Sequence, residues 1–181
     1  MPATPTRELE AHGPIVETAR LQLRKVALSD GPFFLRLLNE PSWLENIGDR
    51  HVRSIAQAED HIKSSIWTQY RASGYGMYAI SLKATLSPIG ICGLVERSFL
   101  PAPDLGFALL PAYVGQGFAF EAAHALLEHA SSSFGIGQLY AIVKRDNGRS
   151  IKLLGRLGFH RERPYSMPQG EEVELYAVSI P

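Results

Sequence analysis

Residues 104–134, DLGFALLPAYVGQGFAFEAAHALLEHASSSF, constrain the fold of this chain more than any other stretch. An apolar strand ends at Pro111, a turn with two glycines follows, and an apolar helix runs from about Gly117 to the residue before Gly135. Gly115 and Gly117 lack side chains where the N–H groups and the dipole of a helix N-terminus attract anions. The stretch therefore predicts a strand–turn–helix unit whose glycines serve either a tight turn or an anion site.

Two common nucleotide motifs fit the glycines poorly. A Walker A loop needs Lys-Ser or Lys-Thr after its last glycine, and neither pair follows Gly117. A dinucleotide fingerprint needs a third glycine and an early parallel βαβ unit. Here the third position is wrong, and the loop lies two thirds along the chain behind an apparent antiparallel meander. These patterns disfavour both interpretations.

The remaining pattern predicts a single α/β (α+β) domain. Apolar periodicity indicates helices at about 31–38, 54–73 and 147–157, with Ser54 and Gln57 as a capping box and Asn147 as an N-cap. Residues 43–50 read as irregular. Seven strands are expected, at 19–26, 76–83, 89–96, 104–110, 137–145, 159–165 and 171–180. We predict a flexible lead-in over 1–14 and one domain over 15–181, with a mixed sheet and helices on both faces.

Composition excludes several classes of function. Lys plus Arg and Asp plus Glu both number 18, so no net charge favours nucleic acid or an anionic membrane. The single cysteine, Cys92, allows no internal disulfide and reads as inert core rather than a nucleophile. His61, His124 and His129 lack metal-ligand spacing, so no metal is expected. With no signal segment and no long apolar run, a cytoplasmic protein is predicted.

Three ordered segments carry a resemblance to a known family. They are VETARLQLRKVALSD near the amino end, LGFALLPAYVGQGFAFEA around the glycines, and NGRSIKLLGRLGF after the next strand. Together they resemble the GNAT superfamily of N-acetyltransferases, and within it the branch that acetylates the N-termini of ribosomal proteins. Ala112 departs from the Gln or Arg that often opens the family's cofactor motif.

The resemblance implies an acetyl-CoA-dependent enzyme that acetylates a primary amine by direct attack in a ternary complex. It implies a V-shaped splay between the strands at 104–110 and 137–145, with the thioester lying in the V. The glycine loop would hold the CoA pyrophosphate, and backbone near Leu109 would stabilise the oxyanion. The cofactor-binding residues expected are Leu109, Leu110, Val114, Gly115, Gln116, Gly117, Phe118, Ala119, Asn147 and Lys152.

The catalytic side chains are less constrained. Ser150, three residues after Asn147, stands where the ribosomal-protein branch has a serine that assists the leaving thiolate, although it could instead bond to the helix backbone. Glu96 or Asp104 could act as a base through water, and either could be only a charge at a strand end. Glu121 reads as a carboxylate in the first turn of its helix. Lys144, Arg145, Arg149, Lys152 and Arg156 form a basic cluster, which is either surface charge or a contact to the 3′-phosphate of CoA.

The acceptor is a small-molecule or protein amine whose identity the sequence leaves open. The resemblance implies an acceptor site between the first two helices, their link and the last hairpin, where Trp43, Asn46, Tyr75 and Tyr165 fall. An alternative function is a non-catalytic acyl-CoA sensor. A monomer or homodimer is expected, without nucleic acid or membrane as a partner.

Overall fold

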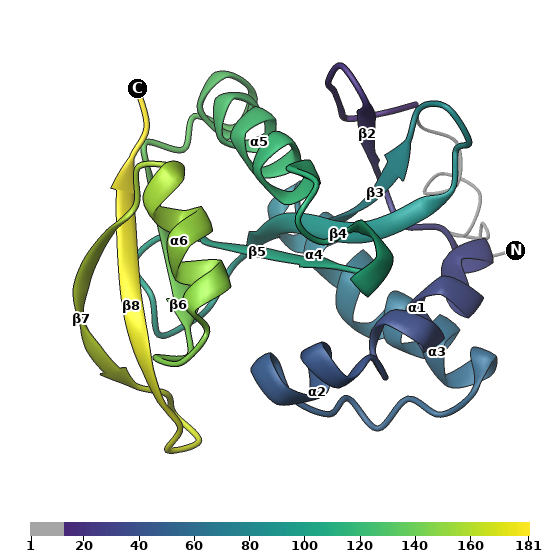
Figure 1. The fold of residues 1–181 in the computed structure, drawn as a ribbon, viewed down its shortest axis with the longest axis horizontal. Helices are drawn as coiled ribbons and strands as arrows, with labels where there is room; N and C mark the ends of the chain where they lie inside the picture. Colours follow the sequence, from purple (N-terminus) through teal and green to yellow (C-terminus); the bar gives the residue numbers. More distant parts are fainter. Residues whose placement is uncertain (1–12) are drawn as a thin grey trace, which may run out of the picture.

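The computed structural model describes residues 13–181, which build one mixed sheet of eight strands. Its spatial order is β1-β2-β3-β4-β5-β6-β8-β7 (Figure 1). Only the β5–β6 pair is parallel. The strands are β1 (Val16–Glu17), β2 (Leu21–Arg24), β3 (Met77–Leu82), β4 (Pro88–Val95), β5 (Asp104–Leu109), β6 (Gln138–Val143), β7 (His160–Ser166) and β8 (Glu172–Ser179).

The sheet has one strand more than the seven expected. The additional strand, β1, is two residues long and pairs Val16 with Leu23 in an antiparallel hairpin with β2. Two residues are too few to produce an alternating pattern in the sequence. Residues 1–12 lie outside the described part of the chain, so the lead-in over 1–14 stays a prediction except for Gly13 and Pro14, which precede β1 without regular structure.

Helices cover both faces of the sheet, as expected. Figure 1 shows α5 and α6 in front of the strands and α4 behind them. Accordingly β3, β4 and β8 are buried along nearly continuous runs rather than at alternate residues. The helices are η1 (Leu28–Asp30), α1 (Gly31–Leu37), α2 (Pro41–Asn46), α3 (Ile55–His61), η2 (Ile62–Ile66), α4 (Trp67–Ser73), η3 (Pro111–Tyr113), α5 (Phe118–Phe134) and α6 (Gly148–Arg156).

The sheet opens between β5 and β6. The two strands pair only at Asp104 and Tyr140, and beyond that point they diverge (Figure 1). Two glycines of β4 allow the chain on either side of this strand to approach closely. A Cβ at Gly90 would lie 2.4 Å from Ala108 O of β5, and one at Gly93 would lie 2.3 Å from Gly76 O, just before β3. Strand β5 is therefore paired with β4 along its whole length, whereas its other side is paired with β6 only at Asp104. This is the expected V-shaped splay.

Two helical details differ from the sequence prediction. The stretch 43–50 is not wholly irregular, because α2 begins at Pro41 and buries Trp43, whose Nε1 donates to Gly48 O at 3.0 Å. The long helix at 55–73 is one segment, but its middle, η2, is a π-helix that separates α3 from α4. Its predicted start is confirmed, since the Gln57 amide donates to Ser54 Oγ at 3.2 Å.

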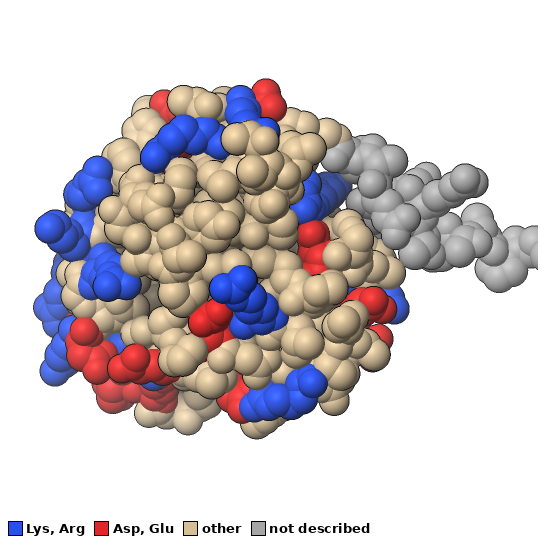
Figure 2. Space-filling view, turned by 45° about the vertical axis from the view of Figure 1, so that its right-hand side comes forward, with Lys and Arg blue, Asp and Glu red and all other residues tan. Residues whose placement is uncertain are grey.

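The sheet edge and surface are polar. β7, at the edge, is almost wholly exposed, and its sequence HRERPYS carries charges and Pro164, which discourage pairing with another chain. On the face in Figure 2, acidic and basic side chains are interspersed, with basic ones more frequent at the left. No helix in residues 13–181 has the length and apolar character needed to cross a membrane.

Candidate functional site

A large cleft occupies the splay between β5 and β6. Its volume is about 1270 Å³, above the ~300–1,000 Å³ typical of small-ligand pockets. One end is formed by β5, the glycine loop and α6, and the other by α1, α2 and the α3–η2–α4 segment. A cleft of this size can hold a long cofactor and a second substrate together.

The glycine loop forms one wall of this cleft. Gly115 and Gly117 have φ values of +83° and +82°, a region that side chains with a Cβ rarely adopt. A Cβ at Gly115 would point into open space, and both glycines line the cleft. No oxygen of residues 13–181 accepts a hydrogen bond from the N–H groups of residues 115–120, whereas the next amide, of Glu121, donates to Gly117 O at 3.0 Å. Unpartnered N–H groups at a helix N-terminus suit an anion.

Other expected loop residues lie differently around the cleft. Val114, Phe118 and Ala119 line it, and Phe118 is 7% exposed. Gln116 does not, because its side chain turns back and donates to Ala112 O at 2.8 Å. Any contribution of Gln116 to the cleft would therefore come from its main chain.

Strand β5 presents backbone groups to the cleft at alternate residues. Leu110 is buried, and its N–H donates to Ile89 O at 2.9 Å, so this amide is already engaged with the strand beside it. Antiparallel pairing alternates, so the N–H groups of Leu109 and Phe107 point away from β4 toward the splay. Of the two residues expected at this place, only Leu109 offers a donor to the cleft.

Helix α6 borders the cleft with its first turns. Asn147 is the N-cap, and its Oδ1 accepts the Ser150 amide at 3.2 Å. Ser150 lines the cleft, and its hydroxyl has no hydrogen-bond partner among residues 13–181, unlike Ser132, whose hydroxyl donates to Glu128 O. Lys152 is exposed and also lines the cleft.

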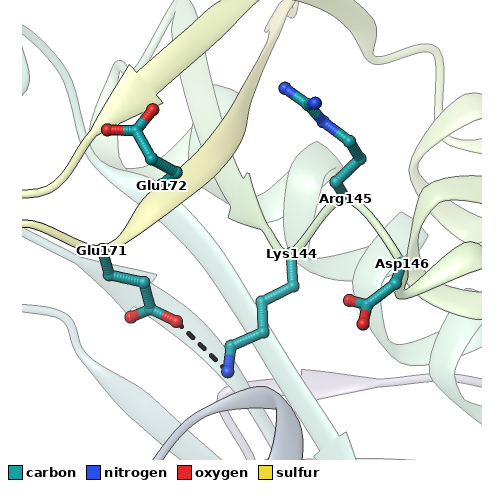
Figure 3. A pocket seen from close by; sticks show the side chains of 5 residues that line it. All are labelled: Lys144, Arg145, Asp146, Glu171 and Glu172. Atoms are coloured by element: carbon teal, nitrogen blue, oxygen red, sulfur yellow. Dashed lines mark ion pairs between the residues drawn. The ribbon is translucent and has the colours of Figure 1, made fainter.

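The basic cluster divides into two groups. Arg149, Lys152 and Arg156 lie on α6 along the cleft, and the Arg156 guanidinium stacks over Phe120 at 4.3 Å. Lys144 instead donates to Glu45 O at 2.7 Å and pairs with Glu171 at 3.2 Å. Figure 3 shows Lys144 reaching toward Glu171 while Arg145 turns away from it.

Both Lys144 and Arg145 hold protein elements together. Lys144 ties the end of β6 to α2 and to the β7–β8 turn, and Arg145 pairs with Glu174 of β8 at 2.8 Å. Their charges are thus largely used within the chain. A role toward an anionic ligand falls to the cations of α6.

The two candidate bases are in different surroundings. Asp104 is 4% exposed, lines the cleft and pairs with Arg97 Nε at 2.8 Å. Burial raises the pKa of Asp104, and the Arg97 charge offsets this only in part. Glu96 is exposed, does not line the cleft, and accepts a hydrogen bond from the Tyr75 hydroxyl.

The structure brings together only two of the four expected acceptor residues. Trp43 and Asn46, both of α2, line the cleft. Tyr75 does not, because its ring packs on Phe134 at the far end of α5, and its hydroxyl is held by Glu96. Tyr165 stacks on Phe99 with ring centres 6.0 Å apart, so it supports a wall residue from behind.

Sequence reasoning missed a polar stripe on the α3–η2–α4 segment. We use the name polar stripe for His61, Ser65 and Gln69, which all line the cleft. The Gln69 Oε1 atom is buried without a hydrogen-bond partner. Burial, and then the nearby Arg50 charge, lower the pKa of His61, which favours its neutral form.

The polar stripe runs across the π-helical turn η2, which brings its residues into closer line. In a regular α-helix of 3.6 residues per turn, residues four and eight apart already lie on one broad face, and an extra residue in one turn reduces the remaining offset between the first and the last of them. The insertion was not readable from apolar spacing. The sequence feature that could have revealed the polar stripe is its spacing, since three polar residues follow one another at intervals of four on one helix.

Within residues 13–181 no three His, Cys, Asp or Glu side chains gather in a way that could bind a metal ion. Cys92 is fully buried, and burial raises the pKa of its thiol to about 12. The groups that line the cleft are backbone donors, hydroxyl and carboxyl groups, the cations of α6 and the imidazole of His61.

The open sheet, the interrupted strand pair and the turn with unpartnered N–H groups beside it define an α/β protein with a cleft large enough for a cofactor. The model of the acetyltransferase (GNAT) domain matches residues 20–160. The chain therefore belongs to the GNAT acetyltransferase family. Acetyl-CoA is the acetyl donor of this family.

Individual relatives agree with the family match. The uncharacterized N-acetyltransferase p20 of Bacillus licheniformis is 28% identical over 170 residues, covering 90% of this chain and 93% of the relative. An acetyltransferase structure from Agrobacterium tumefaciens is 25% identical with a TM-score of 0.77, covering 93% and 95%. The ribosomal L7/L12 acetyltransferase RimL, solved with coenzyme A, has a TM-score of 0.79 at 22% identity, covering 93% and 98%.

Proposed function

We propose that this protein transfers the acetyl group of acetyl-CoA to a primary amine by direct attack within a ternary complex. The observation that carries the proposal is the run of backbone N–H groups from 115 to 120 without partners, at the rim of a cleft opened by the β5–β6 splay. The cofactor's pyrophosphate would accept hydrogen bonds from these groups. Its pantetheine arm would lie along β5, in the place of the missing strand.

Residues of this chain fit such a cofactor. Gly115 leaves open space where a Cβ would stand, so a phosphate can approach the main chain. Lys152 and Arg149 stand on α6 beside the loop and would neutralise phosphate charge, while Asn147 holds the start of that helix in place. The family's acetyl-CoA supplies the thioester to which the amine adds.

The chain's own groups would then assist each stage of the reaction. The neutral amine attacks the thioester carbon, and the N–H of Leu109 donates to the developing oxyanion, which is typically worth a few kcal/mol. Once the C–N bond has formed, the oxyanion would collapse and the C–S bond break, and Ser150 would give its proton to the thiolate and regain one from solvent. Asp104, which lines the cleft and whose pKa is raised by burial, would take the amine proton through water, because a raised pKa makes it a stronger base.

The acceptor would enter over α2 and the polar stripe. Trp43 and Asn46 form one side of this end, and His61, Ser65 and Gln69 the other. Three of the cleft's carboxylates are paired within the chain, Glu40 with Arg36, Asp104 with Arg97 and Glu171 with Lys144, whereas Glu45 and Asp146 have no ion-pair partner among residues 13–181. This end therefore offers neutral hydrogen-bonding groups together with the Glu45 carboxylate. An amine that also carries amide or hydroxyl groups fits it.

A screen of amines with acetyl-CoA, followed by release of free thiol, tests the catalytic proposal. Peptide α-amines, amino sugars and polyamines should all be included, and we expect turnover with the first or second group. Binding of acetyl-CoA without turnover on any amine would favour the sensor alternative.

The cofactor site has its own test in Gly117→Val. A valine at φ +82° is strained, and its side chain would crowd the Arg20 guanidinium, which lies 3.4 Å from the place that a Cβ at this position would take. We expect acetyl-CoA to raise the melting temperature of the natural chain and not that of the variant, measured by thermal shift. Gly155→Val, on α6 but not lining the cleft, is the control, because its Cβ would also meet open space. Normal stabilisation of Gly117→Val by acetyl-CoA would show that the loop is only a turn.

A further inference from the structure

The segment Thr18–Arg20, which joins β1 to β2, contacts the glycine loop although the two are about a hundred residues apart. Arg20 Nε donates to Glu121 Oε2 at 2.7 Å, and its Nη1 donates to Gln116 O at 3.1 Å. The same guanidinium lies 4.3 Å above the centre of the Phe118 ring. Arg20 thus touches the loop, the start of α5 and the carboxylate at the end of its first turn.

Glu121 holds this arginine in place. Its Oε1 accepts the Thr18 hydroxyl at 2.6 Å and the Arg20 amide at 3.0 Å. Partial burial opposes ionisation of Glu121, but the bonds from Thr18 and Arg20 together outweigh it and lower its pKa. The carboxylate is therefore charged at neutral pH, and the guanidinium is fixed from both sides.

The bond to Gln116 O determines the direction of one peptide unit. A trans peptide is planar, so its N–H points opposite to its C=O. With the Gln116 carbonyl turned toward Arg20, the N–H of Gly117 is turned away from it. Gly117 lines the cleft while Gln116 does not, which agrees with this orientation.

Such a constraint is needed at this place. Glycine adopts many backbone conformations at similar energy, so the peptide between Gln116 and Gly117 can rotate easily. In the rotated form a carbonyl oxygen, rather than an N–H, would face the anion. An external contact must therefore select the productive form.

We propose that Arg20 is a positioning residue of the cofactor site, which fixes the 116–117 peptide so that the Gly117 N–H faces the CoA pyrophosphate. The inference rests on the proposed function. It gives the segment ETARL, residues 17–21, a function in cofactor binding through its contact with the glycine loop. Arg20 need not touch the cofactor, because its effect passes through the Gln116 carbonyl.

Binding of three ligands to Arg20→Ala tests the proposal. CoA and dephospho-CoA both carry the pyrophosphate, and each should bind about tenfold or more weakly, as expected for loss of a hydrogen bond from a charged group. Pantetheine lacks the pyrophosphate, so its binding, followed by NMR shifts, should be unchanged. The amide signal of Gly117 in the unliganded chain should also move.

Two further variants make the test specific. Arg53→Ala removes a similarly exposed, ion-paired arginine from the segment that leads into α3 and should leave all three affinities unchanged. Arg20→Lys keeps the charge, but one ammonium cannot reproduce the guanidinium fork on both Glu121 and Gln116, so CoA affinity should still fall several-fold. If Arg20→Ala does not fold, Arg20→Lys takes its place in the binding measurements.

Three outcomes would overturn the inference. Full CoA affinity in both Arg20 variants would show that the loop needs no such contact. An equal loss for pantetheine would indicate general damage to the cleft rather than a change in peptide orientation. A natural chain that fails to bind CoA at all would contradict the proposed function, and this inference with it.

Discussion

Residues of this cleft differ in which of their backbone and side-chain groups already form hydrogen bonds within the chain. At Ser150 the amide is used, since it donates to Asn147 Oδ1, while the hydroxyl has no partner in the described chain. At Leu110 the amide is used and at Leu109 it is directed to the splay. The sequence could place these residues near the cofactor, but it could not tell an engaged group from an available one, because that depends on the register of β5 against β4.

Ser150→Ala separates a catalytic from a structural role. The cap uses the Ser150 amide rather than its hydroxyl, so alanine retains it, and we expect the melting temperature to be nearly unchanged. We expect kcat to fall, at or below the lower end of the ~10²–10⁴-fold range of general acids, because a thiol of pKa about 8.5 leaves readily. The loss should increase at high pH, where solvent protons are scarce. Affinity for acetyl-CoA should be unchanged.

Ser132→Ala is the matched control, because that hydroxyl donates only to the backbone of α5. A Ser150→Ala enzyme with full kcat would remove the hydroxyl from the mechanism and leave water as the proton source. A lower melting temperature with intact kcat would indicate a purely structural hydroxyl.

Long elements were predictable, and short or irregular ones were not. The range expected for α5 agrees with Phe118–Phe134, because its apolar spacing is long and Gly135 ends it. The six-residue α2 was missed, since a helix of fewer than two turns shows no periodicity, and its stability comes from burying Trp43. The π-turn η2 was missed because apolar spacing on either side of it still reads as helical.

Gln69→Leu tests the polar stripe, which runs across this π-turn. A buried carboxamide oxygen without a partner costs about 1–3 kcal/mol, so leucine should leave the melting temperature unchanged or raise it. If Gln69 binds the acceptor, the same change should raise the acceptor's KM about tenfold while acetyl-CoA binds as before. Stability and activity would then move in opposite directions, as is common at functional sites.

Thr68→Val, on the same helix but not lining the cleft, is the control for this substitution. The measurement uses the best acceptor from the amine screen. An unchanged KM in Gln69→Leu would exclude Gln69 from acceptor binding.

At the scale of the whole molecule, the fold was largely predictable and the long-range polar contacts were not. Periodicity and turn residues indicated a mixed sheet and its helices, but not which side chains meet across the chain. Tyr75 and Glu96 satisfy each other outside the cleft, although both were candidates for the site. Lys144 and Arg145 are likewise used by Glu171 and Glu174. Such pairings depend on tertiary distances, which local sequence does not encode.

Glu174 of β8 forms ion pairs with Arg161 of β7 and with Arg145, which follows β6. These pairs should make the stability of the protein depend on pH. Glu174 is 4% exposed, and it accepts bonds from Arg161 Nε at 2.6 Å and Arg145 Nε at 2.8 Å. The bond from Arg161, opposed by burial and aided by Arg145, lowers the pKa of Glu174 from its usual 4.5. A carboxylate with a lowered pKa contributes stability above its unfolded-state pKa and loses it as pH falls through the folded-state value.

Glu174→Gln should therefore melt at a lower temperature than the natural chain at pH 7, with the gap closing as pH falls below about 4.5. The gap closes because a protonated Glu174 resembles glutamine in charge. Melting curves between about pH 7 and pH 3 measure it, and Glu162→Gln, which removes an exposed carboxylate on the same edge, should give a smaller difference at pH 7. A gap for Glu174→Gln that stays constant over this range would mean that the two arginines do not favour its ionised form, and that packing alone joins β6, β7 and β8 here.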